Sequence, residues 1–296
     1  MNTQGRRWLE MSVRCPSAGD RAALLADGLV SLGGRAVEER GGWYVSYFAE
    51  PEDVDAFVRE ARDLLTEETG LSSIQIEHGW QLHEDWAETW KRGLVPRRVS
   101  ERIIVHPSWS LPTDVRPEDV VIVLDPGMAF GTAEHGTTRG CLRLLDGTVR
   151  NGERLLDVGA GSGILGIAAA RLGADQVVAI EADPLACEAL VENIERNRVA
   201  DRVTLIEAWA TAESIAAQGP VTGIIANIER GLLEPLFDGF SRAVVPGGWL
   251  IVSGIRDHEW DDLRAAVTRS GFRFRELDAD GEWRSGLFER LGAGVA

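Results

Sequence analysis

The chain has 296 residues, 44% of them hydrophobic and 26% charged, a composition that allows about two globular domains with buried cores. No apolar run reaches the roughly 20 residues of a membrane-spanning helix, and the first residues lack a signal peptide's apolar segment, so we expect neither. The formal net charge of −16 serves solubility alone, or it disfavours nucleic acid and favours a basic protein partner through electrostatic attraction.

The first part of the chain predicts short elements in the order βαββαβ. The evidence is apolar alternation in the strands, helical spacing of apolar residues, and glycines at the turns. The elements are a strand at 8–13, a helix at 20–32, a hairpin of strands at 35–39 and 42–48, a helix at 54–65 and a strand at 73–77. This order predicts a ferredoxin-like α/β domain over residues 1–80.

A linker is expected over residues 81–100, before the second domain at 101–296. A short helix at 85–91 would place Trp86 and Trp90 four residues apart on one face, a spacing that favours packing between domains over a binding surface. Residues 95–117 are rich in proline, arginine and serine, and residues 103–105 read as a strand within them.

From residue 154 onward the pattern changes to a longer alternation of strands and helices. Strands are predicted at 154–158, 176–180, 203–207, 223–227, 249–253, 272–277 and 285–290. Helices are predicted at 164–172, 184–197, 232–244 and 261–270. Continuously apolar strands separated by helices predict a mostly parallel sheet that is covered on both faces.

The strongest motif is L-L-D-V-G-A-G-S-G-I-L at residues 155–165, where a buried strand leads through Gly159, Gly161 and Gly163 into a helix. Glycines at this point allow a tight turn and let a ligand approach the backbone at the helix N-terminus. Their spacing is G-x-G-x-G rather than the dinucleotide pattern G-x-G-x-x-G, which argues against a pyrophosphate ligand.

Two acidic residues follow the next predicted strand. Glu181 comes at the strand's end, where its carboxylate oxygens can accept hydrogen bonds from both hydroxyls of a ribose. Asp183 precedes Pro184, so we expect it to cap the following helix.

The glycine loop and Glu181 together resemble the class I S-adenosylmethionine-dependent methyltransferases. In that family the glycine loop meets the methionine part of the cofactor, and the acid after the second strand holds the ribose. The resemblance implies a Rossmann-like domain with a mostly parallel seven-stranded sheet, and S-adenosylmethionine as the cofactor.

Further motifs are similar to those of the PrmA family, which methylates large-subunit ribosomal protein eleven. They are D-P-G-M-A-F-G-T-A-E-H-G-T-T at 125–138 and I-I-A-N-I-E-R-G-L-L-E-P-L at 224–236, preceded by E-D-W-A-E-T-W-K-R and V-H-P-S-W. The similarity runs from about residue 84 to 290, whereas the first domain resembles the family's substrate-recognition domain only in element order and size. It implies cofactor contacts at Thr138, Gly159, Glu181 and Asn227, and a covering loop that includes Phe130, Gly131, Thr132 and His135.

The chain departs from the usual family pattern in two places. The family loop usually reads F-G-T-G-T-H-P-T-T, and here Ala133, Glu134 and Gly136 replace its Gly-Thr and Pro. Glu229 stands where the family usually has leucine. Both changes lie where the substrate would enter, so they leave the cofactor site intact and the acceptor open.

Asn227 is the candidate catalytic residue. At the end of the fourth strand, its side-chain carbonyl could accept hydrogen bonds from an amine and align the nitrogen with the methyl group. Methyl transfer is an in-line displacement, so positioning supplies most of the acceleration. The proton of the amine would pass to water or to a carboxylate such as Glu229. The plain alternative for Asn227 is a turn residue, and His135 is either a base or an organiser of its loop.

The leading hypothesis is a protein amine N-methyltransferase that acts on lysine side chains or the N-terminal amine of a ribosomal protein. The alternatives are another protein's lysine or a small amine as acceptor, an NAD-dependent oxidoreductase, and a non-catalytic cofactor sensor. We expect a cytoplasmic monomer with no direct contact to nucleic acid or membrane. We also expect no metal site, because Cys15, Cys141 and Cys187 are few and far apart.

Overall fold

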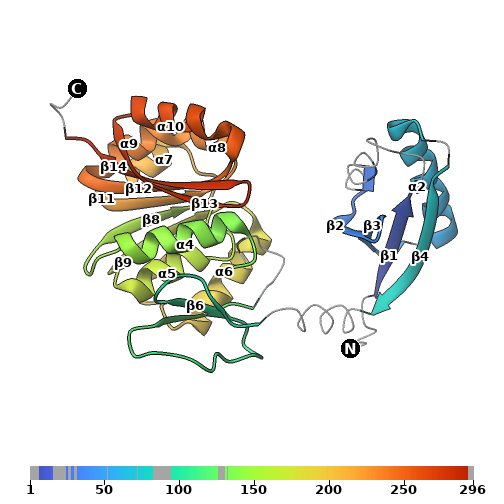
Figure 1. Ribbon diagram of the computed structural model, residues 1–296, viewed down its shortest axis with the longest axis horizontal. Helices are drawn as coiled ribbons and strands as arrows, with labels where there is room; N and C mark the ends of the chain where they lie inside the picture. The colour runs from blue at the N-terminus through green and yellow to red at the C-terminus, as the bar shows by residue number, and fades with distance from the viewer. Residues whose placement is uncertain are drawn as a thin grey trace. The chain divides into compact units, whose positions relative to one another are not determined.

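The chain divides into two compact units, residues 1–93 and 94–296 (Figure 1). The computed structural model describes residues 7–15, 25, 28–29, 32–51, 53–71, 73–82, 95–125, 131 and 133–292. The helix predicted at 85–91 and most of the helix predicted at 20–32 lie outside these ranges. Within them, no helix combines the length and the apolar character needed to cross a membrane.

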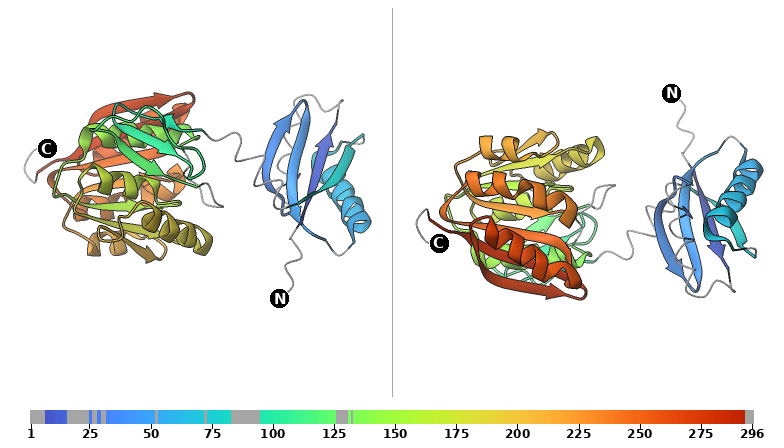
Figure 2. Two further views of the ribbon diagram at one scale, coloured as in Figure 1. Left: turned by 90° about the horizontal axis from the view of Figure 1, so that it is seen from below. Right: turned by 90° about the horizontal axis from the view of Figure 1, so that it is seen from above.

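The first unit is a four-stranded antiparallel sheet with the strand order β2-β3-β1-β4. Its elements are β1 Arg7–Arg14, β2 Arg35–Arg40, β3 Trp43–Ala49, α2 Val54–Thr69 and β4 Gln75–Leu82. Alternate residues of β1 are buried against α2, which covers one face of the sheet (Figure 2). The predicted strands, hairpin and second helix are confirmed, and β4 extends past residue 80 into the stretch predicted as linker.

The second unit is built on a seven-stranded sheet with the order β10-β9-β8-β11-β12-β14-β13. The strands are β8 Arg154–Val158, β9 Gln176–Glu181, β10 Val203–Glu207, β11 Val221–Asn227, β12 Val244–Arg256, β13 Phe272–Asp280 and β14 Trp283–Arg290. Only β14 runs antiparallel to its neighbours. A smaller sheet pairs β5 Arg97–Arg98, β6 Ile103–His106 and β7 Val120–Val123.

Helices cover both faces of the large sheet (Figure 1). One layer holds α4 Gly136–Thr148, α5 Ile164–Leu172 and α6 Pro184–Arg196, and the other holds α7 Ala212–Ala217, α8 Arg230–Leu233, α9 Phe237–Ala243 and α10 Trp260–Arg269. Apolar side chains of the central strands pack into both layers, which explains why these strands read as continuous apolar runs. The predicted mostly parallel, doubly covered sheet is confirmed.

The helix predicted over 232–244 is wrong as a single helix. The segment is α8, the 3-10 turn η2 Glu234–Leu236, and α9. Pro235 is the second residue of η2, and because proline lacks an N–H and its ring clashes with the preceding turn, a continuous α-helix breaks there. Helices α4 and α7 and strand β7 were not predicted.

The strand order places the functional edge of the sheet. From β8, the chain builds outward through β9 and β10 on one side and through β11 and β12 on the other. The two loops that leave β8 and β11 therefore diverge to opposite faces, and a crevice opens between them at the carboxyl ends of the strands.

Gly223 in β11 offers a test of the packing beneath this crevice. A Cβ at Gly223 would overlap the indole ring of Trp249, a buried residue of the neighbouring β12. We expect Gly223→Ala to lower the free energy of unfolding by about 1–3 kcal/mol, measured by urea denaturation. Gly147→Ala is the control, because Gly147 is exposed in α4 with open space around it, and alanine there should stabilise by up to about 1 kcal/mol. Equal stability of the two variants would contradict this account.

Candidate cofactor and active site

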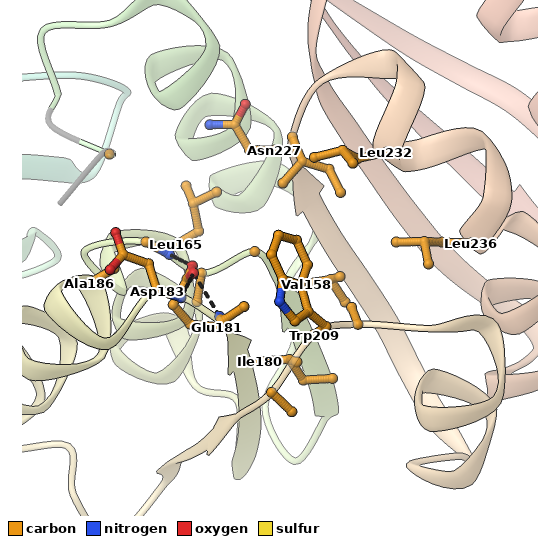
Figure 3. A pocket seen from close by; sticks show the side chains of 18 of the residues that line it. Val158, Leu165, Ile180, Glu181, Asp183, Ala186, Trp209, Asn227, Leu232 and Leu236 are labelled. Atoms are coloured by element: carbon orange, nitrogen blue, oxygen red, sulfur yellow. Dashed lines mark hydrogen bonds between the residues drawn. The ribbon is translucent and has the colours of Figure 1, made fainter. Parts of the chain in front are cut away.

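A cavity of about 410 Å³ opens at the carboxyl edge of the large sheet. Its wall is built from the segments that follow β8, β9, β10 and β11, with further side chains from α4, α5, α6, α8 and η2 (Figure 3). The lining residues used below are Gly131, Thr138, Gly159, Gly161, Glu181, Asp183, Trp209, Asn227, Ile228, Leu232 and Leu236.

The glycine loop is shaped by backbone conformations that other residues rarely adopt. Gly159, Gly161 and Gly163 have φ values of 69°, 54° and 79°. Gly159 and Gly161 line the cavity, and a Cβ at Gly159 would overlap the side chain of Ile228. Gly163 is not among the lining residues: it is the N-cap of α5, and a Cβ there would lie 2.8 Å from Cγ of Leu190. Its glycine is therefore explained by helix packing, and its cofactor contact stays a prediction.

The Glu181 carboxylate lies in the cavity and is held by three backbone N–H groups. Oε2 accepts from Gly161 at 2.8 Å, and Oε1 accepts from Ala182 at 2.8 Å and Asp183 at 2.9 Å. A carboxylate has about four acceptor positions, so roughly one remains for a ligand hydroxyl. Glu181 thus ties the glycine loop to the end of β9 as well as facing the cavity. Asp183 accepts from Leu185 N and caps α6, as predicted.

Two buried polar atoms of the cavity wall have no hydrogen-bond partner among the described residues. They are Oγ1 of Thr138 and Oδ1 of Asn227. An unsatisfied buried polar group costs about 1–3 kcal/mol, so such atoms mark positions that a ligand completes. A hydroxyl can donate to a carboxylate and an amide oxygen can accept from an ammonium, which fits the amino-acid end of S-adenosylmethionine.

Trp209 is a cavity residue that the sequence analysis missed. Its side chain is 76% exposed although it lines the cavity, directly after β10. In Figure 3 it is seen between Glu181 on one side and Leu232 and Leu236 on the other. The available signal was an aromatic residue just past a strand that ends at the carboxyl edge of the sheet.

Asp157, in the motif before the glycines, was also missed. Oδ2 accepts a hydrogen bond from Gly166 N at 2.8 Å, near the start of α5, while Oδ1 is buried without a partner among the described residues. Burial raises the pKa of Asp157 to about 7, and the nearby Glu181 charge acts in the same direction. Asp157 therefore connects β8 to α5 beneath the glycine loop.

The remaining candidates lie at the margin of the site or beyond the described residues. His135 Nδ1 lies 2.7 Å from Thr137 Oγ1 and its ring packs 4.8 Å from that of Trp283, which supports the role of organising its loop. Burial lowers the pKa of His135, and the Arg139 charge adds to this. Glu229 is exposed as the N-cap of α8. Phe130 and Thr132 lie outside the described residues.

Neither a metal centre nor a reactive thiol is found in the part of the chain that the structure describes. No three His, Cys, Asp or Glu side chains there are grouped to hold an ion. Cys15, Cys141 and Cys187 are buried and form no disulfide, and burial raises the pKa of Cys141 to about 12. A thiol that stays protonated at neutral pH is a poor nucleophile.

A sheet of this order, with a glycine loop after β8, an acid after β9 and an asparagine ending β11, defines a class I S-adenosylmethionine-dependent methyltransferase. Comparison with known proteins identifies the family of methyltransferases. The model of the family "Ribosomal protein L11 methyltransferase (PrmA)" matches residues 32–290, and the chain belongs to this family. The match begins within the first unit, well before the motifs that carry the resemblance in the sequence.

Individual relatives agree with this assignment. The ribosomal protein L11 methyltransferase of Chloroflexus aurantiacus is 41% identical over 246 residues, covering 71% of this chain and 75% of the relative. That of Pelobacter propionicus is 35% identical over 310 residues, covering 96% and 98%. The crystal structure of a ribosomal protein L11 methylase from Lactobacillus delbrueckii subsp. bulgaricus matches with a TM-score of 0.60 and 28% identity, covering 67% of this chain and 99% of that one. The expected fold, methyltransferase activity and cofactor are confirmed.

The buried Asp157 predicts a pH dependence of stability. A carboxyl whose pKa rises from 3.8 in the unfolded chain to about 7 on folding holds its proton more tightly when folded. The contribution of Asp157 to the free energy of unfolding is therefore fully present below about pH 4 and is lost as the pH rises through 7. Asp157→Asn keeps an oxygen for Gly166 N–H but cannot ionise, so its stability relative to wild type should grow between pH 4 and 7 and then level off. Chemical denaturation of both proteins across this pH range checks the prediction. A constant difference between their free energies of unfolding would show that Asp157 does not titrate there.

Proposed function

We propose that this protein transfers methyl groups from S-adenosylmethionine to amines of ribosomal protein L11, on lysine side chains, the N-terminus or both. The observation that supports an amine acceptor is Oδ1 of Asn227, which is buried in the cavity wall and has no hydrogen-bond partner within the described part of the chain. Family membership and the names of the relatives support the choice of protein substrate. The alternative acceptor is a lysine of another protein or a small amine. It stays open because the chain departs from the usual family pattern at Ala133, Glu134, Gly136 and Glu229.

The cofactor is proposed to lie along the carboxyl ends of β8, β9 and β11. Glu181 would accept a hydrogen bond from a ribose hydroxyl, and the Trp209 ring beside it offers an apolar face for the adenine. Thr138 Oγ1 would donate to the carboxylate of the methionine part. The positive φ values of Gly159 and Gly161 shape the turn along which the cofactor would lie.

The bound cofactor supplies an electrophilic methyl group, whose bond to sulfur breaks as its bond to the amine nitrogen forms. The protein's task is to hold a neutral amine in line with that bond. Asn227 Oδ1 has two lone pairs and can accept one N–H from the cofactor's ammonium and one from the substrate amine. We assign the proton lost by the amine to water, with Glu229 at the start of α8 as the alternative acceptor.

The first unit, including predicted domain 1–80, is proposed to select the protein substrate. Every described residue that lines the cavity lies between 131 and 236, and the first unit has its own buried core. A tethered unit that binds the substrate raises the effective concentration of its amines at the cavity. We further infer a monomer that acts in the cytoplasm without contact to nucleic acid or membrane. The charge of −16 supports one part of this, because it favours a basic protein partner over nucleic acid.

Asn227→Ala tests the function and the catalytic role together. Wild type and variant are incubated with isotopically labelled S-adenosylmethionine and purified ribosomal protein L11, and the labelled residues are located by mass spectrometry. We expect label on amines with wild type, and a kcat lowered by about 100-fold or more in the variant, because amine alignment is lost. S-adenosylhomocysteine has the same ammonium group as the cofactor, so the variant loses one hydrogen bond to it. Its affinity for S-adenosylhomocysteine should therefore fall by only about tenfold.

Two results would count against this proposal. If Asn227→Ala turns over as fast as wild type, Asn227 has no catalytic role and only forms a turn after β11. Failure of wild type to label ribosomal protein L11, together with labelling of other proteins in a total cell extract, would move the activity to another acceptor.

Removal of the first unit tests substrate selection. A truncated protein that retains residues 84–296 should fold and bind S-adenosylhomocysteine as the full chain does, since the cavity is intact. We expect it to methylate intact ribosomal protein L11 at least about tenfold more slowly at low substrate concentration, because the tethering contribution is lost. Short amine-bearing peptides at high concentration serve as the control and should react alike with both proteins. Full activity of the truncated protein on intact substrate would place recognition in the second unit.

A further inference from the structure

The segment from Ala133 to Thr138 joins the cofactor cavity to the far end of the sheet. At one end Thr138 lines the cavity, and nearby Ser162 of the glycine loop donates to the carbonyl of Gly131 at 2.7 Å. Between these two points, at Gly136, the segment packs on the turn between β13 and β14. A Cβ at Gly136 would lie 3.1 Å from the carbonyl oxygen of Asp280 and 3.1 Å from the ring of Trp283.

Arg139, in the first turn of α4, donates hydrogen bonds both to the segment and to Asp280 at the β13–β14 turn. Its Nε and Nη2 donate to the two carboxylate oxygens of Asp280 at 2.8 and 2.7 Å. Its remaining nitrogen, Nη1, donates back to the main chain of the segment, to the carbonyls of Glu134 and of Ala133, the latter at 3.4 Å. One guanidinium thereby fastens the segment to the β13–β14 turn.

Electrostatics single out this arginine. The N-terminal end of a helix carries partial positive charge, so an arginine in the first turn of α4 is disfavoured unless an anion compensates. Asp280 is that anion: hydrogen bonding to Arg139 and then to Arg143 lowers the pKa of its carboxyl to about 2. The Arg139 and Asp280 side chains are only 21% and 23% exposed, which limits screening by solvent.

Arg143, one turn further along α4, provides the contrast. It bonds to Asp278 at 2.6 Å through two nitrogens and to Asp280 at 2.9 Å. Within the described residues its hydrogen bonds all go to these two carboxylates and none to the segment. The two arginines therefore share the ion-pair cluster, but only Arg139 connects it to the main chain beside the cavity.

We propose that Arg139 is a positioning residue for the cofactor site: through the carbonyls of Ala133 and Glu134 it holds the segment in place, so that the Thr138 hydroxyl faces the cavity. This inference rests on the proposed placement of the cofactor's methionine part against Thr138. Arg139 itself is not among the described residues that line the cavity.

The test measures cofactor affinity and stability separately in the full-length protein. Calorimetric titration with S-adenosylhomocysteine gives the affinity, and thermal unfolding without ligand gives the stability. Arg139→Ala should weaken S-adenosylhomocysteine binding by about tenfold and raise the KM for S-adenosylmethionine to match, with kcat at saturation within about twofold of wild type. Arg143→Ala is the matched control: it should lose comparable stability and bind S-adenosylhomocysteine as wild type does.

Two further variants separate positioning from a plain structural role. Exchange of the charges, Arg139→Asp with Asp280→Arg, restores the ion pair but not the donors to the segment's carbonyls. Because Arg143 loses its bond to Asp280 in this variant, the exchange should recover only part of the stability lost in Arg139→Ala, and none of the affinity. Arg139→Lys keeps a donor for a carbonyl and should recover part of the affinity.

Equal affinities for Arg139→Ala and Arg143→Ala, or full recovery of affinity in the exchanged pair, would overturn the inference. If the wild-type protein binds no S-adenosylhomocysteine, the proposed function fails instead, so the two failures are distinguishable.

Discussion

The hydrogen bond from Gly161 N–H to the Glu181 carboxylate ties together the two loops on which the site depends. It joins the turn after β8 to the end of β9, and the same carboxylate also accepts from Ala182 and Asp183. Three backbone donors on one carboxylate leave little freedom to either loop. The glycine loop is thus organised by the acid that also faces the cavity, so binding and loop geometry are coupled at Glu181.

This arrangement is possible because parallel strands end at one edge of the sheet. The ends of β8, β9, β10 and β11 supply Gly159, Glu181, Trp209 and Asn227 to one cavity, although these residues span a long stretch of sequence. Divergence of the loops after β8 and β11 keeps the edge open for a ligand. Thr138 Oγ1 and Asn227 Oδ1, which have no partner in the described ranges, lie in this cavity, where a bound ligand can offset the cost of their burial.

A second set of interactions secures the site from outside. Helix α4 carries Thr138 into the cavity, and its charged side is held by Asp278 and Asp280 of β13 through Arg139 and Arg143. These ion pairs join residues about 140 positions apart in the chain, and their partial burial makes them less sensitive to salt than surface pairs. The last strands of the fold therefore help to fix the position of α4, although none of their described residues lines the cavity.

The sequence by itself determined the alternation of strands and helices, the glycine loop, the acid after β9, the asparagine ending β11 and the family. Each of these is a local pattern, because strand periodicity, positive-φ glycines and short motifs depend on near neighbours. Contacts between distant segments were left to the tertiary structure. The tertiary structure brings Arg139 to Asp280 and places Trp209 in the cavity. It also shows that Gly163 packs against Leu190. Periodicity also continued through Pro235, where the structure ends α8 and begins a 3-10 turn. Strand order decides which distant residues become neighbours, and no local pattern encodes that order.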